Sequence, residues 1–347
     1  MKAGVLHGPN DIRCESIPRP KISDEEVLVA IKAAGICGSD ILRYEKGISP
    51  YNFKILGHEC AGEVVEVGSR VKDVKRGDKV AIMPVVPCGR CPLCKVGKYS
   101  LCDNFIRMGT RVDGLFVEFA KVSPKNLLKL PDNIDFESAS LLEPAAIALH
   151  TIKRGKLFPG DLVVIMGCGP IGCLCAQFAY LLGARKVYVV DIAEEKLKIA
   201  KNVGISLCIN ARKEDPVKRI LEENKEGADL VIESAGSLKT LEQSIKITRK
   251  RGRISLLGLM REDVVISRET YYTILNHELN LYGVYDTDLE PLPPFNSWYT
   301  ALHFLVEGKL KVKPLISHRF KIDKISEVFR SISQNKDKFN KVIFLFD

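Results

Sequence analysis

One uncharged stretch, residues 162–184, restricts the fold of this 347-residue chain more than any other feature. It is long enough to cross a bilayer as a single helix. Three glycines and a proline interrupt it at residues 167–172 (GCGPIG), however, and such helix breakers do not suit a lipid-facing span. A buried strand followed by a buried helix explains the same residues. The sequence therefore predicts a strand over 162–166 and a helix over 169–182 inside a globular protein, and no membrane segment.

Downstream of this stretch, strand patterns alternate with helix patterns. The predicted strands cover residues 187–191, 207–210, 229–234 and 254–258, and the predicted helices cover residues 194–202 and 238–249. Alternation of this kind is typical of a parallel sheet covered by helices on both faces, so we predict the α/β class.

The flanking parts of the chain have a different pattern. The first ~145 residues contain short predicted strands between turn signals, for example 27–31, 62–67 and 79–83. After residue 283, a bend rich in proline (Pro291, Pro293, Pro294) precedes a predicted helix over 298–307 and a last strand over 341–346. We therefore predict a β-rich domain at 1–146, a nucleotide-binding domain at 147–284, and a segment at 285–347 that returns to the first domain.

Composition excludes few classes of function. A hydrophobic content of 46% and a net charge of +9 describe an ordinary globular protein. The densest basic run, residues 246–253 (KITRKRGR), is interpreted as a solvated helix end rather than a nucleic-acid surface. Many of the eleven cysteines lie in apolar surroundings, and residues 1–10 lack the apolar core of a secretory leader. Both observations favour a reducing cytoplasm.

The interrupting glycines form the pattern Gly-x-Gly-x-x-Gly, and Asp191 ends the next predicted strand about 20 residues later. A strand, a glycine turn, a helix and an acidic residue in this order are typical of dinucleotide binding, with the pyrophosphate at the helix N-terminus. A carboxylate beside the adenosine ribose repels a 2′-phosphate, so NAD is favoured over NADP. A glycine turn that serves only packing, and Asp191 as a helix cap, remain alternatives. The candidate cofactor-binding residues are Gly167, Gly169, Pro170, Ile171, Gly172, Asp191 and Lys196.

Four cysteines lie close together at Cys88, Cys91, Cys94 and Cys102. Four thiolates at this spacing suit one tetrahedral Zn²⁺ with no open position, which is the arrangement of a structural site. A disulfide pair, an iron–sulfur cluster and a nucleic-acid-binding zinc ribbon are the alternatives. We predict a structural zinc lobe over about residues 84–104.

Further possible ligands of a metal lie outside this loop, at Cys37, His58, Glu59 and Glu143. Catalytic zinc uses about three protein ligands of these types and leaves one position open, where it acts as a Lewis acid. A lone histidine is more often structural, so the spacing by itself leaves this second site open.

These motifs together resemble the zinc-dependent medium-chain dehydrogenases over essentially the whole chain. Residues 57–71 match the zinc signature of that family, GHE-x2-G-x5-G-x2-V, and GDKV follows at 77–80. The resemblance implies a GroES-like β-barrel domain and a Rossmann domain, two zinc ions per chain, NAD, and a homodimer or homotetramer. It also implies that Cys37, His58 and Glu143 bind the catalytic zinc, that Glu59 binds it in some states, and that Ser39 contacts the substrate hydroxyl.

Within the family, the segments LLEP at 141–144 and IALH at 147–150 resemble the polyol dehydrogenase branch. The segments GKL at 308–310 and PLISHR at 314–319 resemble the enzymes that oxidise galactitol 1-phosphate to tagatose 6-phosphate. A free polyol or a small secondary alcohol is the alternative substrate, and a zinc-stabilised nucleotide-binding protein without turnover is the alternative class. Arg43, Lys46 and Arg111 are candidates for binding a phosphate, because they flank the metal segments. Leu42 occupies the position of a proton-relay histidine in many members.

Overall fold

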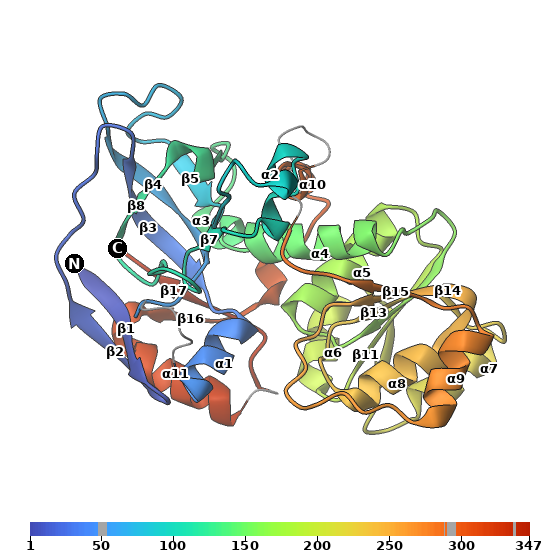
Figure 1. Cartoon of the computed structure of the whole chain (residues 1–347). Helices are drawn as coiled ribbons and strands as arrows, with labels where there is room; N and C mark the ends of the chain where they lie inside the picture. The colour runs from blue at the N-terminus through green and yellow to red at the C-terminus, as the bar shows by residue number, and fades with distance from the viewer. Residues whose placement is uncertain (48–53, 288, 290–295, 336–337) are drawn as a thin grey trace. The chain divides into compact units, whose positions relative to one another are not determined.

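The computed structural model describes residues 1–47, 54–287, 289, 296–335 and 338–347. The predicted proline-rich bend (Pro291, Pro293, Pro294) lies outside these residues. The chain divides into two compact units (Figure 1). The first unit comprises Met1–Glu143, Asp288–Glu307 and Ile316–Asp347, and the second comprises Pro144–Thr287 and Gly308–Leu315.

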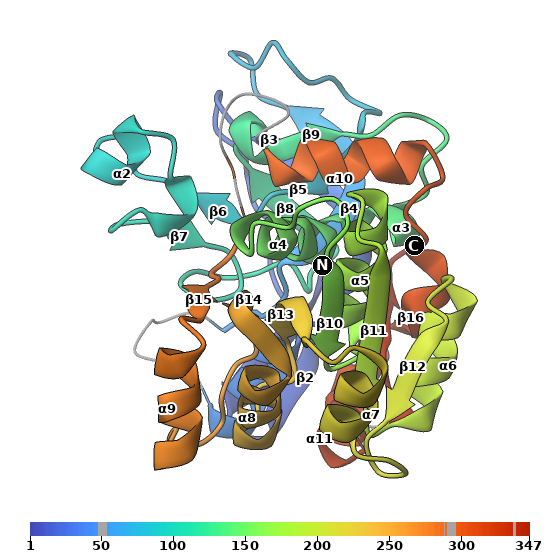
Figure 2. The same cartoon turned by 90° about the vertical axis from the view of Figure 1, so that its right-hand side faces the viewer.

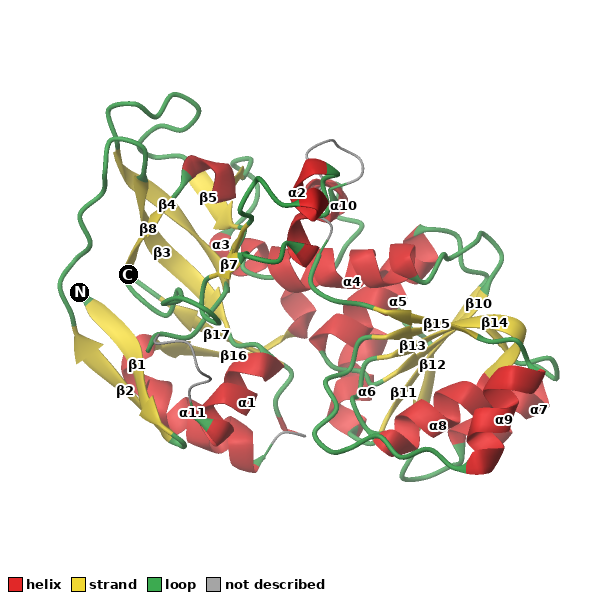
Figure 3. Cartoon of the chain, viewed as in Figure 1, coloured by secondary structure: helices red, strands yellow, loops and turns green. Residues whose placement is uncertain are grey.

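A seven-stranded sheet forms the frame of the first unit (Figure 3). Its strand order is β16-β17-β3-β4-β5-β9, and β8 also pairs with β3. The sheet consists of β3 (Val27–Gly35), β4 (Glu59–Val67), β5 (Lys79–Ile82), β8 (Phe119–Val122), β9 (Leu127–Lys129), β16 (Ile316–Lys321) and β17 (Lys341–Leu345). Two further pairs are β1 (Lys2–Gly8) with β2 (Asp11–Ser16) and β6 (Val85–Val86) with β7 (Ile106–Arg107). The strands predicted over 27–31, 62–67 and 79–83 lie in β3, β4 and β5, and β17 from the end of the chain lies beside β3.

Aromatic side chains fill the core of the first unit beside its helices. Tyr44, Phe116, Phe329 and Phe344 are buried and pack edge to face, with ring centroids 5.4 to 6.0 Å apart. The helices are α1 (Gly38–Lys46), α2 (Pro92–Lys95), α3 (Phe136–Ala139), α10 (Ser297–Val306) and α11 (Ile325–Gln334). The helix predicted over 298–307 is therefore confirmed as α10, with a shift of one residue.

The second unit contains a six-stranded parallel sheet in the order β12-β11-β10-β13-β14-β15. This order is that of a doubly wound dinucleotide-binding sheet, and the strand order switches from one side of β10 to the other between β10 and β13. Helices cover both faces: α4 and α5 lie above the sheet in Figure 1, and α7, α8 and α9 lie below it. The strands are β10 (Leu162–Met166), β11 (Lys186–Asp191), β12 (Leu207–Asn210), β13 (Ala228–Glu233), β14 (Thr248–Leu256) and β15 (Asn280–Gly283). The helices are α4 (Leu142–Arg154), α5 (Pro170–Leu181), α6 (Glu194–Asn202), α7 (Pro216–Glu223), α8 (Leu238–Ile247) and α9 (Arg268–Asn276), and Figure 2 shows this unit from a second side.

The uncharged stretch at 162–184 forms β10 and α5, as the sequence predicted. Most side chains of both elements are fully buried, which explains the absence of charge. Within the described residues, no helix combines the length and the apolar character that a membrane crossing requires.

The basic run at 246–253 is not a solvated helix end, so that interpretation is wrong. Helix α8 ends at Ile247, and β14 begins at the next residue. Arg253 is 7% exposed, and its guanidinium donates to Asp161 Oδ2 at 2.8 Å. Arg249 forms an ion pair with Asp229. The sequence of the run alone resembles a charged helix end, but two of its arginines neutralise carboxylates within the second unit.

Candidate metal centres and cofactor loop

Cys37, His58 and Glu59 form one group in the first unit. Cys37 precedes α1 as its N-cap residue, and Glu59 is the first residue of β4. Pairing of Gly35 with Glu59 joins these two segments, and a Cβ at Gly35 would collide with Glu59 Oε2. One ligand atom from each of the three side chains lies within 4.8 Å of the others. The group of described residues within this limit does not include Glu143.

Asp40 supports this group and was missed in the sequence analysis. The fully buried carboxylate accepts hydrogen bonds from Cys37 N at 3.0 Å and Gly57 N at 3.4 Å. Asp40 Oδ1 also lies 3.5 Å from His58 Nδ1. Burial lowers the pKa of His58, but the charges of Asp40 and Cys37 outweigh it, so the pKa lies well above the usual value. The thiolate, imidazole and carboxylate donors of this group fit Zn²⁺.

Glu59 has a buried cationic partner in Lys341 on β17. Lys341 is 3% exposed, and its Nζ donates to Glu59 Oε2 at 2.5 Å and to Ile36 O at 3.0 Å. Burial lowers the pKa of Lys341, but the charges of Glu59, Cys37 and Glu143 outweigh it and raise the pKa above its usual value. Lys341 is therefore charged and ties the C-terminal strand to the metal group.

Glu143 has a different cationic partner. It is 1% exposed in the first turn of α4, and its Oε1 accepts a hydrogen bond from Arg107 Nη2 at 2.8 Å. Arg107 belongs to β7, directly after the four-cysteine loop. The two carboxylates that the sequence analysis offered as zinc ligands therefore have different buried cationic partners.

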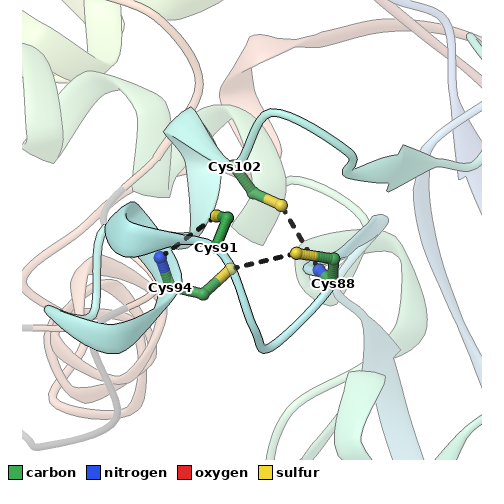
Figure 4. A group of neighbouring side chains, drawn as sticks. All are labelled: Cys88, Cys91, Cys94 and Cys102. Atoms are coloured by element: carbon green, nitrogen blue, oxygen red, sulfur yellow. Dashed lines mark hydrogen bonds between the residues drawn. The ribbon is translucent and has the colours of Figure 1, made fainter.

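The four cysteines of the loop converge (Figure 4). One sulfur atom from each lies within 4.8 Å of the others, and Cys88 Sγ is 4.0 Å from Cys94 Sγ. A tetrahedral zinc with bonds of ~2.3 Å needs sulfur separations of about 3.8 Å, so the loop fits the ion. Hydrogen bonds from the amides of Arg90 and Cys91 lower the pKa of Cys88 to about 6, which favours its thiolate form. All eleven cysteines are free thiols, in contrast to the disulfide alternative.

The glycine loop connects β10 to α5 in the second unit. Gly167 has a φ of +97°, and a Cβ at Gly172 would collide with Gly167 O, so these two positions require glycine. Gly169 is the N-cap of α5, and a Cβ there would meet nothing within 4 Å. The backbone at the helix N-terminus is therefore open to a ligand, as the binding of a pyrophosphate requires.

Comparisons with known proteins agree with this arrangement. Residues 23–132 match the alcohol dehydrogenase GroES-like domain family, and residues 170–307 match the zinc-binding dehydrogenase family. Sorbitol dehydrogenase of Bacillus subtilis is 34% identical over 99% of this chain and 96% of its own length. L-threonine 3-dehydrogenase of Pyrococcus furiosus is 37% identical over 94% of this chain and 92% of its own length. The crystal structure of galactitol-1-phosphate dehydrogenase from Escherichia coli superimposes with a TM-score of 0.92 at 33% identity and covers 100% of both chains.

The chain belongs to the zinc-dependent medium-chain dehydrogenases. This membership confirms the predicted α/β fold, with a GroES-like domain and a Rossmann domain. The protein is an oxidoreductase of the alcohol and polyol dehydrogenase type that acts on a small molecule and uses zinc and a nicotinamide dinucleotide.

In this medium-chain dehydrogenase, Asp191 lies at the end of β11 beside the glycine loop. Its Oδ2 accepts a hydrogen bond from Cys168 N at 2.7 Å, and its Oδ1 accepts one from Ala193 N at 2.8 Å. The N-cap of α6 is Ala193, so Asp191 does not cap that helix. Lys196 is half-buried in α6, and its carbonyl oxygen accepts a hydrogen bond from the Cys168 thiol at 3.6 Å.

The predicted substrate residues of the dehydrogenase lie in two places. Arg43 is half-buried in α1, and its Nη1 donates to Ser39 O at 3.0 Å, whereas Lys46 is exposed at the end of the same helix. Arg111 lies after β7 and stacks on the Phe105 ring, 4.0 Å from its centroid. Arg43 therefore contacts Ser39 directly, one helical turn away.

Proposed function

We propose that this enzyme oxidises a secondary hydroxyl of a polyol phosphate with NAD, and that the conversion of galactitol 1-phosphate to tagatose 6-phosphate is the leading candidate. The observation that carries the proposal is the Cys37, His58 and Glu59 group in a chain of the zinc-dependent dehydrogenase family. Structural agreement with galactitol-1-phosphate dehydrogenase over the full chain supports the choice of substrate.

The proposed roles of the residues follow from their places. Cys37, His58 and Glu59 hold the catalytic zinc, with Glu143 beside them, and the four-cysteine loop holds the structural zinc. When bound, the catalytic ion supplies the Lewis acidity that makes a hydroxyl proton easier to remove. Ser39, two residues after Cys37, accepts that proton and passes it to the nicotinamide ribose and water, because Leu42 cannot relay it.

The cofactor is proposed to lie on the second unit. The glycine loop binds the pyrophosphate through the amides at the N-terminus of α5, and Asp191 accepts hydrogen bonds from the adenosine ribose. Lys196 contacts the ribose side. NAD is preferred over NADP because the Asp191 carboxylate repels a 2′-phosphate.

The deciding experiment is steady-state oxidation of galactitol 1-phosphate, sorbitol, threonine and 2,3-butanediol with NAD, before and after chelation. We expect the highest kcat/KM for the phosphorylated hexitol and loss of all activity when the metal is removed. Equal or better turnover of sorbitol would indicate that the substrate is a free polyol and not a polyol phosphate. The similarity to sorbitol dehydrogenase favours this alternative. Full activity after exhaustive removal of zinc would refute the metal-dependent mechanism.

We propose Arg43 as the main contact of the substrate phosphate, with Lys46 and Arg111 in outer positions. Arg43→Met should raise the KM for galactitol 1-phosphate by about tenfold or more, because a charge-assisted hydrogen bond is lost. The KM for sorbitol should change less than twofold in the same variant. Equal effects on both substrates would show that Arg43 acts only through Ser39 and α1.

We further propose a cytoplasmic homodimer or homotetramer with domains at 1–146, 147–284 and 285–347. The edge strand β15 pairs with β14 alone among the described strands and exposes Leu281, and Tyr285 is exposed just beyond it. An apolar edge of this kind is normally covered, and a second copy of the same edge would cover it.

A further inference from the structure

The backbone directly before His58 is held by a second segment of the first unit, residues 113–116. Asp113 Oδ1 accepts hydrogen bonds from the amides of Lys54 at 2.7 Å and Ile55 at 3.0 Å. The next three amides donate in the other direction: Gly114 N to Ile55 O at 2.7 Å, Leu115 N to Gly57 O at 3.0 Å, and Phe116 N to Leu56 O at 3.0 Å. These hydrogen bonds fix the path of the chain into His58.

Gly57 is the residue at which this path is most restricted. Its φ is +94°, which suits glycine, and a Cβ there would lie 2.5 Å from the Phe116 ring. Its carbonyl oxygen is closely covered, since a Cβ at Gly114 would lie 2.5 Å from it. Its amide donates to Asp40 Oδ1 at 3.4 Å, and the same oxygen lies 3.5 Å from His58 Nδ1. Both peptide groups of Gly57 are therefore held, and with them the direction in which the chain enters His58.

The 113–116 segment follows the return arm of the four-cysteine loop. This arm begins with β7, which pairs with β6 at the base of the loop. Arg111 stacks on Phe105, and its Nη1 donates to Phe105 O at 3.1 Å. Phe105 itself packs in the small buried cluster that contains three of the four cysteines. A Cβ at Gly109 in the same arm would lie 2.5 Å from Gly57 O, so the arm touches the backbone before the metal ligand.

We propose that residues 113–116 are a positioning element of the catalytic metal group, which holds the backbone at Gly57 so that the His58 imidazole meets the metal bound by Cys37 and Glu59. This inference rests on the proposed function, because it requires a metal at that group. The distance from a zinc ion to its ligand varies by only about 0.2 Å, so a small displacement of the His58 backbone weakens the site. Asp113, which is exposed and belongs to none of the zinc motifs, is then a positioning residue.

Asp113→Ala removes the acceptor of two of these hydrogen bonds and leaves every proposed ligand in place. We expect the Kd for Co²⁺ at the catalytic group to rise by about fivefold or more, because binding must then order the His58 backbone as well. Asp113→Asn keeps an oxygen that can accept both amides and should stay within about twofold of the wild type. Both variants should fold, since β1 also holds this backbone through Leu6 N and Lys54 O at 2.7 Å.

Gly114→Ala tests the contact with Gly57 directly. A Cβ there would lie 2.5 Å from the carbonyl oxygens of both Leu56 and Gly57, so this backbone must shift. Gly114 is not among the glycines with a left-handed φ, so alanine adds no backbone strain of its own. We expect the affinity for Co²⁺ to fall by about tenfold or more and the visible absorption of the bound Co²⁺ to change.

Asp78→Ala is the matched control in the same unit. Asp78 Oδ2 accepts a hydrogen bond from Lys75 N at 2.9 Å and pairs with Lys129 Nζ at 3.1 Å. Its loss should lower the thermal stability of the protein and leave the affinity for Co²⁺ within about twofold of the wild type. The experiment titrates Co²⁺ into full-length protein from which the catalytic metal has been chelated while the closed four-cysteine site keeps its zinc.

The outcomes separate the two proposals. Wild-type affinity for Co²⁺ in both D113A and G114A, or an equal loss of affinity in D113A and D78A, would overturn the role of residues 113–116. If G114A does not fold, D113A, D113N and D78A decide, and equal affinities in these three variants would overturn it. Wild-type protein whose Co²⁺ spectrum is insensitive to Cys37→Ser would overturn the proposed function itself.

Discussion

Buried charge organises the metal centre at the scale of single residues. Asp40, Glu59 and Glu143 are at most 1% exposed, so each carboxylate depends on nearby hydrogen-bond donors or cations. Removing one member of a buried ion pair leaves an uncompensated charge and costs about 3–5 kcal/mol. An exposed pair is worth about 0–1 kcal/mol. The two kinds of pair can therefore be told apart by stability measurements.

Lys341→Met tests the buried partner of Glu59. We expect the free energy of unfolding of the metal-free protein to fall by about 3–5 kcal/mol, because the buried Glu59 Oε2 then has lost its cationic partner. Urea denaturation measures the change. The matched control is Arg319→Met, which breaks a pair with Glu137 in which the arginine is 40% exposed. Equal losses in the two variants would mean that the buried pair adds nothing beyond a surface contact.

Cys37→Ser and His58→Ala test the division of labour between the two units. Each variant should lose turnover by at least 10³-fold, because both supply proposed zinc ligands. Binding of NADH, measured by its fluorescence, should stay within about twofold of the wild type, since the glycine loop belongs to the other unit. Loss of NADH affinity in either variant would contradict the separation of metal and cofactor residues.

Neighbouring residues of the metal centre could be predicted from sequence, but distant ones could not. His58 and Glu59 lie within one motif, and Asp40 lies three residues after Cys37, where its side chain accepts the amide of Cys37. Asp40 was therefore within reach of the same reasoning. Lys341 and Arg107 could not be predicted, because they lie 282 and 36 residues away from Glu59 and Glu143 in the sequence and belong to no local motif.

At the scale of elements, the loop between β10 and α5 depends on Asp191 as well as on its glycines. Asp191→Asn keeps an oxygen that can accept the amide of Cys168 but removes the negative charge. We expect the ratio of kcat/KM for NAD to that for NADP to fall by about tenfold or more, because a 2′-phosphate is no longer repelled. The KM for NAD should rise less. An unchanged ratio would show that Asp191 does not select the cofactor. Its role would then be limited to the hydrogen bond that it accepts from Cys168 N in the loop.

We expect the order of the four-cysteine loop to depend on its metal. Cys91→Ser removes one ligand, and few apolar side chains remain to hold residues 88–102. We expect the loop to become a site of limited proteolysis and the thermal midpoint to fall by about 2–4 °C for each kcal/mol lost. Intact resistance to protease together with full loss of zinc from the loop would show that packing alone maintains it.

Elements with strong periodicity were predictable, and short polar ones were not. Helix α5 is buried on nearly every side and lacks charge, which the sequence displays directly. Helices α7 and α9 were missed, because α7 has only eight residues, four of them charged, and α9 contains two tyrosines and two threonines, which are weak helix formers. The start of β14 was missed because its basic residues suit either a helix end or a strand. The strand is stabilised by the contacts of Arg253 with Asp161 and of Arg249 with Asp229, which are distant in the sequence.

At the scale of the whole molecule, the chain builds one unit, leaves it for a second, and returns. The last strand, β17, pairs with β3 through Ile343 opposite Gly35 and Leu345 opposite Ala33. The change from short strands to alternating strands and helices predicted this path. The pairing register could not be predicted, because two apolar strands can pair in several registers and only the surrounding packing selects one.

The remaining whole-molecule question is what covers β15. Leu281 and Tyr285 are 37% and 54% exposed, and Tyr271 and Leu275 on α9 are also exposed. If two copies pair through this edge, Leu281→Lys places like charges close together across the two-fold axis and should shift the protein to a monomer at micromolar concentration. Light scattering after size-exclusion chromatography measures the mass. Val96→Lys, on a more exposed apolar side chain (68%) of the four-cysteine loop, should leave the mass unchanged. A Leu281→Lys variant that keeps the wild-type mass would place the interface on another surface.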